Sequence, residues 1–251
     1  MKPLNAVTLI FALLFGVLYF AFSVQLAMAG RTDAFLYAVY APPKQIYTAP
    51  APKPPQIILH TVPFTSQAPR ANWAEPRFQD GCEEAAGIMA NAWARGINLP
   101  SPQEVEQEIF KMAEFGATHL GTYQDTSATD TARLFRDYFG LNDIKVVSKP
   151  TAQQIIAALK TNKLVVAPTN GKRLKNPNYK NGGPLTHILL IRGYDEATDE
   201  FITNDPGTRL GNGYRYDSAV LLGALQDYPS GFHLPQIPGD TAIIVIGRSI
   251  N

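Results

Sequence analysis

QDGCEEAA, at residues 79–86, decides the fold, because it places the only cysteine of this 251-residue chain at the predicted start of a helix. Apolar residues then recur at helical spacing as far as Arg95, and Gly96 supplies a stop. The first turn of a helix carries unpaired N–H groups and partial positive charge, which lower the pKa of a thiol. The pattern predicts that Cys82 is a nucleophile; the alternative is a buried, inert cysteine.

Two carboxylates, Glu83 and Glu84, directly follow the cysteine. Negative side chains in a first turn complement the partial charge of the helix N-terminus. We therefore interpret both as ordinary first-turn residues. The alternative is that Glu84 reaches into the substrate cleft.

A cysteine nucleophile needs a base, and His187 alone among four histidines lies in an apolar strand, predicted over residues 186–195. Burying an imidazole costs free energy unless it has partners, and a strand positions it rigidly. We predict that His187 is the base; the alternative is a satisfied core histidine. His60 and His119 are typical of surface or edge positions. His233 lies in a Pro/Gly-rich loop and either lines the cleft or is an ordinary loop residue.

An imidazole that acts as a base needs an orienting acceptor, and a predicted turn at residues 196–199 folds the next strand back beside His187. Asp205, at the end of that strand, is our candidate. Asn204 competes with it, and the two point to opposite faces of the strand, so at most one fits. An aspartate cap of an Asp-Pro-Gly turn is the other interpretation of Asp205.

The oxyanion of the tetrahedral intermediate needs hydrogen-bond donors. Gln67 precedes the cysteine, and its side-chain amide is predicted to act together with the Cys82 backbone N–H. Gln79, which is closer in sequence, is the rival candidate.

Along the chain these residues occur in the order Gln, Cys, His, Asp. With that order, the motifs resemble the double-glycine-leader (bacteriocin-processing) peptidase-like family, a branch of the papain-like cysteine peptidases. The matching pieces are VPFTSQAP (62–69), NWAEPRFQDGCEEAA (72–86), HILLIRGYDE (187–196) and ITNDPGT (202–208). The resemblance implies a papain-like fold, and it gives the oxyanion, nucleophile, base and orienting roles to Gln67, Cys82, His187 and Asp205.

This chain departs from true leader peptidases, which have a shorter Gln-to-Cys spacing and are usually fused to an ATP-driven exporter. No P-loop of the form GxxxxGK[ST] occurs in the sequence. The chain is therefore similar to stand-alone members of the family, and we expect no fused exporter domain and no leader cleavage.

Helical signals crowd the first half of the domain and strand signals the second, which predicts an α+β fold with N-terminal helices packed on an antiparallel sheet. Capping boxes and glycine stops predict helices over residues 82–95, 102–116, 130–139 and 152–160. Short Val- and Ile-rich runs predict strands over residues 144–148, 163–168, 186–195, 200–204 and 242–247.

Residues 6–26 contain no charge and have the length needed to cross a bilayer. Lys2 before them and Arg31 after them place the N-terminus in the cytoplasm. Residues 1–29 are therefore a transmembrane anchor or, because an A-x-A cleavage site occupies 27–29, a signal peptide. A proline-rich spacer is predicted over 30–56 and an exported domain over 57–251.

Composition excludes several classes of function. The formal net charge is +1, which gives no electrostatic case for nucleic-acid binding. One cysteine cannot form an intrachain disulfide or a multi-cysteine zinc site. We expect no metal or cofactor, a peptide or protein substrate, and a membrane contact through the N-terminal segment.

The residues together predict an exported thiol hydrolase that cleaves a peptide or amide bond. An acyltransferase or transglutaminase-like enzyme with the same triad is one alternative, and a non-catalytic surface module is another. The basic loop at residues 171–183 either rims the cleft, favouring acidic substrates, or is simply solvated, and Trp73 either lines the cleft or packs against it.

Overall fold

This computed structural model describes residues 16–21 and 54–248. The chain divides into two units, 1–53 and 54–251, and in the first of them residues 16–21 are helical. Most of the predicted membrane segment and proline-rich spacer therefore lies outside the described residues. Within the described ranges, no helix combines the length and the apolar character needed to cross a bilayer.

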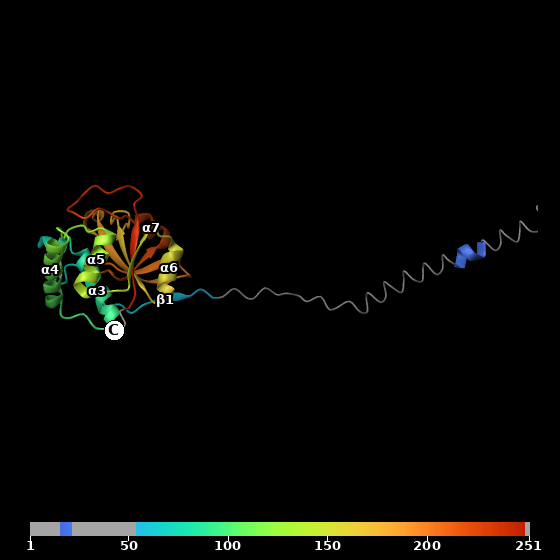
Figure 1. Cartoon of the computed structure of the whole chain (residues 1–251), viewed down its shortest axis with the longest axis horizontal. Coiled ribbons are helices and arrows are strands. Elements are labelled where there is room, and N and C mark those ends of the chain that lie inside the picture. Colours follow the sequence, from blue (N-terminus) through green and yellow to red (C-terminus); the bar gives the residue numbers. More distant parts are fainter. Residues whose placement is uncertain (1–15, 22–53, 249–251) are drawn as a thin grey trace, which may run out of the picture. The chain divides into compact units, whose positions relative to one another are not determined.

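A seven-stranded sheet forms the centre of the second unit (Figure 1). Its strands run in the order β2-β7-β3-β4-β5-β6, with β1 paired to β4, and each pairing is antiparallel. The strands are β1 (Ile57–Leu59), β2 (Ile144–Ser148), β3 (Leu164–Thr169), β4 (His187–Asp195), β5 (Glu200–Asn204), β6 (Asn212–Asp217) and β7 (Ala242–Ile246).

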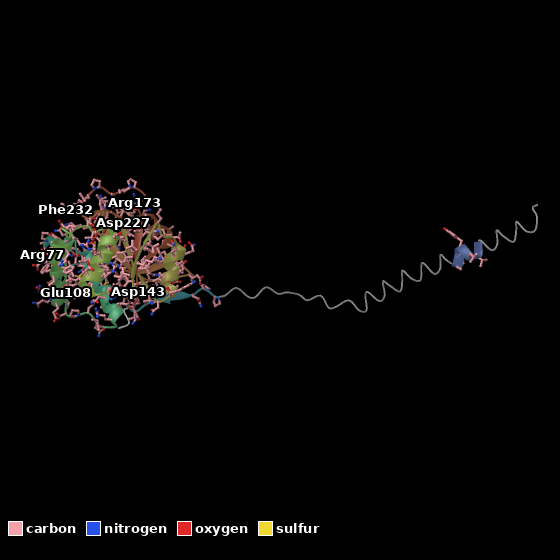
Figure 2. The ribbon with its side chains drawn as sticks, viewed as in Figure 1. Arg77, Glu108, Asp143, Arg173, Asp227 and Phe232 are labelled. Carbon is pink, nitrogen blue, oxygen red and sulfur yellow. The ribbon has the colours of Figure 1, made fainter. Side chains whose placement is uncertain are left out.

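Helices cover both faces of this sheet, with α3, α4 and α5 on one side and α6 and α7 on the other (Figure 1). The helices are α2 (Pro76–Gln79), α3 (Cys82–Arg95), α4 (Pro102–His119), α5 (Ala128–Phe139), α6 (Ala152–Lys160) and α7 (Ser218–Ala224), with a short 3-10 helix η1 (Lys180–Gly182). Charged side chains such as those of Arg77, Glu108 and Asp143 lie at the periphery of the domain (Figure 2).

Alternate residues of the central strands belong to two separate cores. In β3, Leu164 and Val166 pack with α3, α4 and α5, whereas Val165 and Ala167 pack with α6 and α7. Successive side chains of a strand point to opposite faces, so a sheet covered on both sides needs continuous apolar runs. The predicted α+β architecture with an antiparallel sheet is confirmed, and the second helical layer explains the unbroken Val and Ile runs.

Local capping signals set most helix ends. Ser101 and Glu104 form the predicted capping box of α4, and Thr151 and Gln154 form that of α6. The predicted stop of α3 at Gly96 is also present, with φ of 67° in the left-handed region that glycine favours.

Two predicted helix ends were wrong. Helix α4 continues three residues beyond the predicted stop at Gly116, where a Cβ would lie 3.1 Å from the Thr122 carbonyl oxygen. The glycine there permits close packing and does not end the helix. Helix α5 begins before the predicted Asp130, because the Ser127 side chain accepts a hydrogen bond from the Asp130 N–H at 3.2 Å.

The short or polar elements were not predicted from the sequence: β1, α2, β6, α7 and η1. Strand β6 reads NGYRYD, a polar run without a clear alternation of apolar residues. Its last residue, Asp217, caps α7 by accepting a hydrogen bond from the Ala219 N–H at 2.9 Å.

The core that α3, α4 and α5 share gives a test of how packing contributes to the stability of the fold. Phe135 in α5 is fully buried in the core shared by α3, α4 and α5. We expect Phe135→Ala to lower the free energy of unfolding by about 3–5 kcal/mol, because it removes apolar contacts and leaves a cavity. Urea denaturation followed by circular dichroism measures this, with exposed Arg136→Ala on the same helix as the control, expected within about 0.5 kcal/mol of wild type. Equal losses in both variants would contradict the assignment of Phe135 to the core.

Candidate active site

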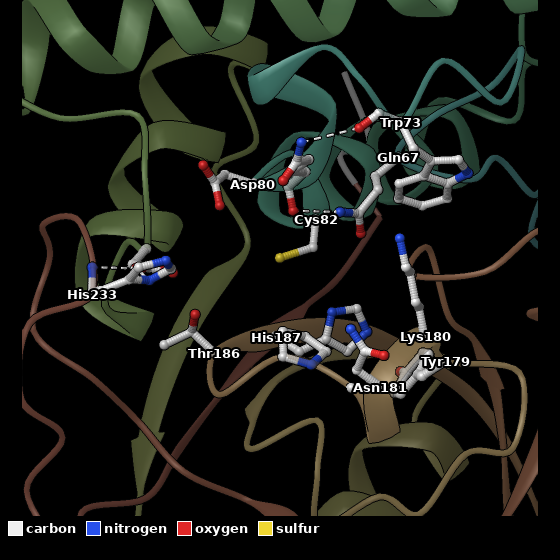
Figure 3. Close-up of a pocket in the computed structure, with 15 residues that line it drawn as sticks. Gln67, Trp73, Asp80, Cys82, Tyr179, Lys180, Asn181, Thr186, His187 and His233 are labelled. Carbon is white, nitrogen blue, oxygen red and sulfur yellow. Dashed lines mark hydrogen bonds and ion pairs between the residues drawn. The ribbon is translucent and has the colours of Figure 1, made fainter.

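A cavity of about 340 Å³ opens where the N-terminus of α3 meets the start of β4. Both Cys82 and His187 line it, so the structure brings the predicted nucleophile and base to one site (Figure 3). The walls differ in charge: Asp80 and His233 lie on one side of Cys82 and Lys180 on the other (Figure 3).

His187 is held by a buried carboxylate. Its Nε2 lies 2.9 Å from Asp205 Oδ1, and the two residues are 1% and 0% exposed. The β4–β5 hairpin, with the predicted turn at residues 196–199, brings the two residues together. The rival Asn204 instead donates to the carbonyl oxygens of Val62 (3.3 Å) and Pro63 (3.2 Å), away from the imidazole.

The second oxygen of Asp205 is also occupied. Its Oδ2 accepts hydrogen bonds from the hydroxyls of Tyr179 and Tyr216, both at 2.5 Å, and from Asn176 Nδ2 at 3.3 Å. Burial works to raise the pKa of Asp205, but the charge of His187 and these hydrogen bonds together outweigh it and lower the pKa. Asp205 is therefore ionised at neutral pH despite its burial.

Cys82 begins α3 as predicted, but its thiol has an unexpected partner. The residue is 6% exposed, and Sγ donates a hydrogen bond to Glu83 Oε2 at 3.0 Å. No hydrogen bond joins Sγ to His187 in the described part of the chain. The thiol and the imidazole thus share the pocket without contacting each other through a hydrogen bond.

The predicted lowering of the thiol pKa by the helix N-terminus was wrong. Burial and the neighbouring charge of Glu83 raise the pKa of Cys82 well above its usual value, although the Ile188 backbone N–H acts in the opposite direction. A thiolate is disfavoured both by loss of water and by a nearby carboxylate. Cys82 is therefore a neutral thiol in this structure.

The interpretation of Glu83 and Glu84 as ordinary first-turn residues was also wrong, because each is only 1% exposed. Glu83 Oε1 accepts hydrogen bonds from the Thr126 N–H and the Tyr228 hydroxyl, both at 3.2 Å. Burial raises the pKa of Glu83 to about 7. Burial and the charge of Glu83 raise the pKa of Glu84 well above its usual value.

The side-chain amide of Gln67 also lines the pocket, with both N–H groups engaged. Its Nε2 donates to the carbonyl oxygens of Phe78 and Gln79 at 2.9 Å each, while Oε1 is buried without a partner. Donation to an oxyanion would require the amide to give up one of these bonds. The exposed side chain of Gln79, which also lines the pocket, donates to the Trp73 carbonyl at 3.0 Å. The oxyanion roles of Gln67 and Gln79 stay predictions.

His233 lines the cavity, as one of its two interpretations predicted, but its partner Asp125 was not singled out from the sequence. Asp125 Oδ2 accepts a hydrogen bond from the His233 backbone N–H at 2.7 Å and lies 3.0 Å from the His233 ring Nδ1. The two residues form a second histidine–aspartate pair, on the acidic wall of the cavity. Both residues have φ of 49°, a backbone conformation that apolar periodicity does not reveal. Tyr179 and Tyr216 were missed because an isolated tyrosine gives no signal of its hydrogen-bond partner.

The cavity is lined by Trp73 and by part of the basic loop at residues 171–183. For each of them, this was one of the two alternatives predicted from the sequence. Lys180 and Asn181 form the wall opposite Asp80 and His233 (Figure 3). Because the two walls carry opposite charges, the basic loop alone does not set the charge of the site.

The family model described as "Peptidase_C39 like family" matches residues 59–228, more than half of the chain. The chain belongs to the C39-like peptidase family. The expected family is thereby confirmed, and the protein is a cysteine peptidase-like hydrolase. No curated protein matches its sequence significantly.

Solved structures also match this C39-like peptidase. A protein from Bacillus anthracis, described as a C39-like peptidase, has a TM-score of 0.50 at 15% identity, covering 78% of this chain and 100% of that one. The peptidase domain of Streptococcus ComA, a bi-functional ABC transporter involved in a quorum-sensing pathway, has a TM-score of 0.40 at 13% identity, covering 67% and 92%.

The Cys82–Glu83 contact of this C39-like peptidase gives a test of thiol chemistry. We expect Glu83→Gln to lower the pKa of the Cys82 thiol, because it removes the negative charge that disfavours the thiolate. The thiolate fraction at pH 7 then rises, and alkylation by iodoacetamide becomes faster by on the order of tenfold. The rate of alkylation against pH, followed by intact-protein mass spectrometry, measures both quantities.

The matched control is Glu114→Gln, which makes the same replacement at an exposed glutamate of α4. It leaves the environment of Cys82 unchanged, so its alkylation profile should coincide with that of wild type. A Glu83→Gln profile that also coincides with wild type, in a protein with unchanged melting temperature, would show that Glu83 does not control the thiol.

Proposed function

We propose that this protein is an exported thiol hydrolase that cleaves peptide or amide bonds with Cys82 as nucleophile, His187 as general base and acid, and Asp205 as orienting acceptor. The observation that carries the proposal is the buried 2.9 Å hydrogen bond between His187 and Asp205 in a pocket that Cys82 also lines. Membership of the C39-like peptidase family supports the reaction class.

The orientation of the imidazole suits proton transfer. Asp205 engages Nε2 of His187, which leaves Nδ1 as the nitrogen available to the thiol. In the proposed reaction the Cys82 side chain turns from Glu83 toward His187, and the S–H proton passes to Nδ1. The thiolate then attacks the substrate carbonyl carbon, forming a C–S bond and an oxyanion.

The oxyanion needs a donor, and the Cys82 backbone N–H is suitably placed. It belongs to the first turn of α3, where backbone N–H groups have no partner within the helix. Gln67 becomes the second donor when its amide exchanges a main-chain carbonyl for the oxyanion. Its unpartnered Oε1 means that the resting arrangement already leaves part of this amide unsatisfied.

Departure of the amine and hydrolysis of the acyl-enzyme complete the proposed reaction. Collapse of the intermediate breaks the C–N bond, and the leaving amine takes the proton from His187 Nδ1. Water gives a proton to the imidazole as it attacks the acyl-enzyme, the C–S bond breaks, and the proton returns to sulfur. An acyltransferase would differ only here, because an amine would replace water.

Export and the substrate class complete the proposal. The uncharged run at residues 6–26 supports an N-terminal membrane anchor or a cleaved signal peptide, with the peptidase domain on the outer side. A peptide or protein is the substrate expected from the family. The acidic and basic walls of the pocket both contribute to its recognition.

Activity-based labelling of the full chain tests the nucleophile and the base. A peptide acyloxymethyl ketone should label wild-type protein at Cys82, identified by mass spectrometry of the labelled peptide. We expect His187→Gln to reduce the labelling rate by on the order of 10³-fold, because the base that takes the thiol proton is lost. Exposed His119→Gln is the matched control and should label like wild type.

Substrate cleavage gives the complementary measurement. Cys82→Ala should abolish cleavage of a mixed peptide library while its melting temperature stays close to that of wild type. Full cleavage by Cys82→Ala, or equal labelling by His187→Gln and wild type, would refute the assignment. Products formed with an added amine separate hydrolysis from acyl transfer.

A further inference from the structure

Two tyrosines complete the environment of Asp205, and the proposed reaction gives them no part. Tyr179 and Tyr216 each donate a hydrogen bond to Oδ2 at 2.5 Å. Asn176 joins the cluster by donating to Tyr216 Oη at 2.7 Å as well as to Oδ2. The Gly207 N–H donates to Oδ1 at 3.0 Å, beside the His187 bond.

The donors are suited to keeping a carboxylate charged in a buried place. A buried carboxylate is costly unless its oxygens are hydrogen-bonded, and here both oxygens of Asp205 accept at least two hydrogen bonds. Burial and the charge of Asp205 raise the pKa values of Tyr179 and Tyr216 well above the usual value. Both phenols therefore remain protonated donors across the working range of pH.

Packing around the imidazole restricts its rotation. The Tyr179 ring stands edge-on to the His187 ring, with centroids 5.5 Å apart and planes at 75°. On the neighbouring turn, a Cβ on Gly207 would lie 2.9 Å from His187 Cε1 and 3.1 Å from Tyr179 Cε1. The two rings and the turn therefore touch closely, and the imidazole is held by contact as well as by Asp205.

Tyr179 also ties the wall of the pocket to this cluster. Both Tyr179 and Asn176 belong to the loop at residues 171–183, and both donate to Asp205. The next residues, Lys180 and Asn181, line the pocket (Figure 3). The hydroxyl of Tyr179 thus links the substrate-facing loop directly to the acceptor that orients His187.

We propose that Tyr179 and Tyr216 are positioning residues for the reaction: they hold Asp205 as a carboxylate, and Tyr179 makes the loop at 171–183 one hydrogen-bonded unit with the His187–Asp205 pair. The inference rests on the proposed function, since it gives these tyrosines a part in the same reaction. Their effect on His187 is nevertheless measurable without any substrate.

Removal of the hydroxyls separates this role from simple packing, because Tyr→Phe keeps the ring. Without the donors the carboxylate is less stabilised, so Asp205 takes up a proton at higher pH and stops accepting the Nε2–H of His187. We expect Tyr179→Phe and Tyr216→Phe each to lower kcat on the order of tenfold with KM little changed. The double variant should lose more, and the acid-side inflection of kcat should move to higher pH in all three.

The matched control is Tyr214→Phe. Tyr214 packs beside Tyr216 with ring centroids 4.7 Å apart, but no hydrogen bond joins its hydroxyl to Asp205. It should show the wild-type pH profile. Site-specific 3,5-difluorotyrosine at position 179 should have the opposite effect to Tyr179→Phe, because a more acidic phenol donates a stronger hydrogen bond to Asp205. The acid-side inflection of kcat should then move to lower pH.

A measurement without substrate keeps this test independent of peptide cleavage. In the full-chain Cys82→Ala protein, ¹⁵N NMR of the His187 ring reports loss of the Nε2–H···Asp205 bond as pH falls. That transition should occur at higher pH in the Tyr179→Phe and Tyr216→Phe versions. The positioning role would be overturned if the NMR transition were unchanged in the folded variants, or if Tyr214→Phe shifted it equally. If wild type cleaved no peptide but the NMR shift were present, only the peptidase function would be overturned.

Discussion

The structure of this site depends on one buried interaction, the hydrogen bond between His187 Nε2 and the carboxylate of Asp205. An ionised carboxylate without water is tolerated only with partners, and removing one partner leaves an uncompensated charge. The antiparallel β4–β5 pairing fixes the backbone on both sides of this bond, and both side chains are buried. The fold and the site are therefore stabilised by the same arrangement of strands.

The thiol lies in surroundings of the opposite kind. His187 is hydrogen-bonded to the carboxylate of Asp205, whereas the Cys82 thiol lies against Glu83, whose negative charge disfavours the thiolate. The start of α3 thus combines a dipole that favours negative charge with buried carboxyl groups that oppose it. The site consequently combines a neutral thiol with an imidazole that a buried carboxylate orients.

Local signals predicted much of this fold and the identity of the pocket's two central residues. The limits of α3, its stop at Gly96 and the return of β5 beside β4 depend on nearby residues, and each was predicted. The choice between Asn204 and Asp205 was left open, because strand alternation separates their faces without saying which face meets His187. The burial of Glu83 and the hydrogen bonds of Tyr179 arise from segments distant in sequence, and no local pattern carries that information.

Strand β1 has a consequence for how the domain is presented to its surroundings. Ile57 pairs with Asp195 at the last position of β4, whereas His187 occupies the first. Eight residue steps separate these positions, which is roughly 27 Å along an extended strand. The described chain therefore enters the sheet at the end of β4 that is remote from the cavity, and no residue of β1 lines that cavity.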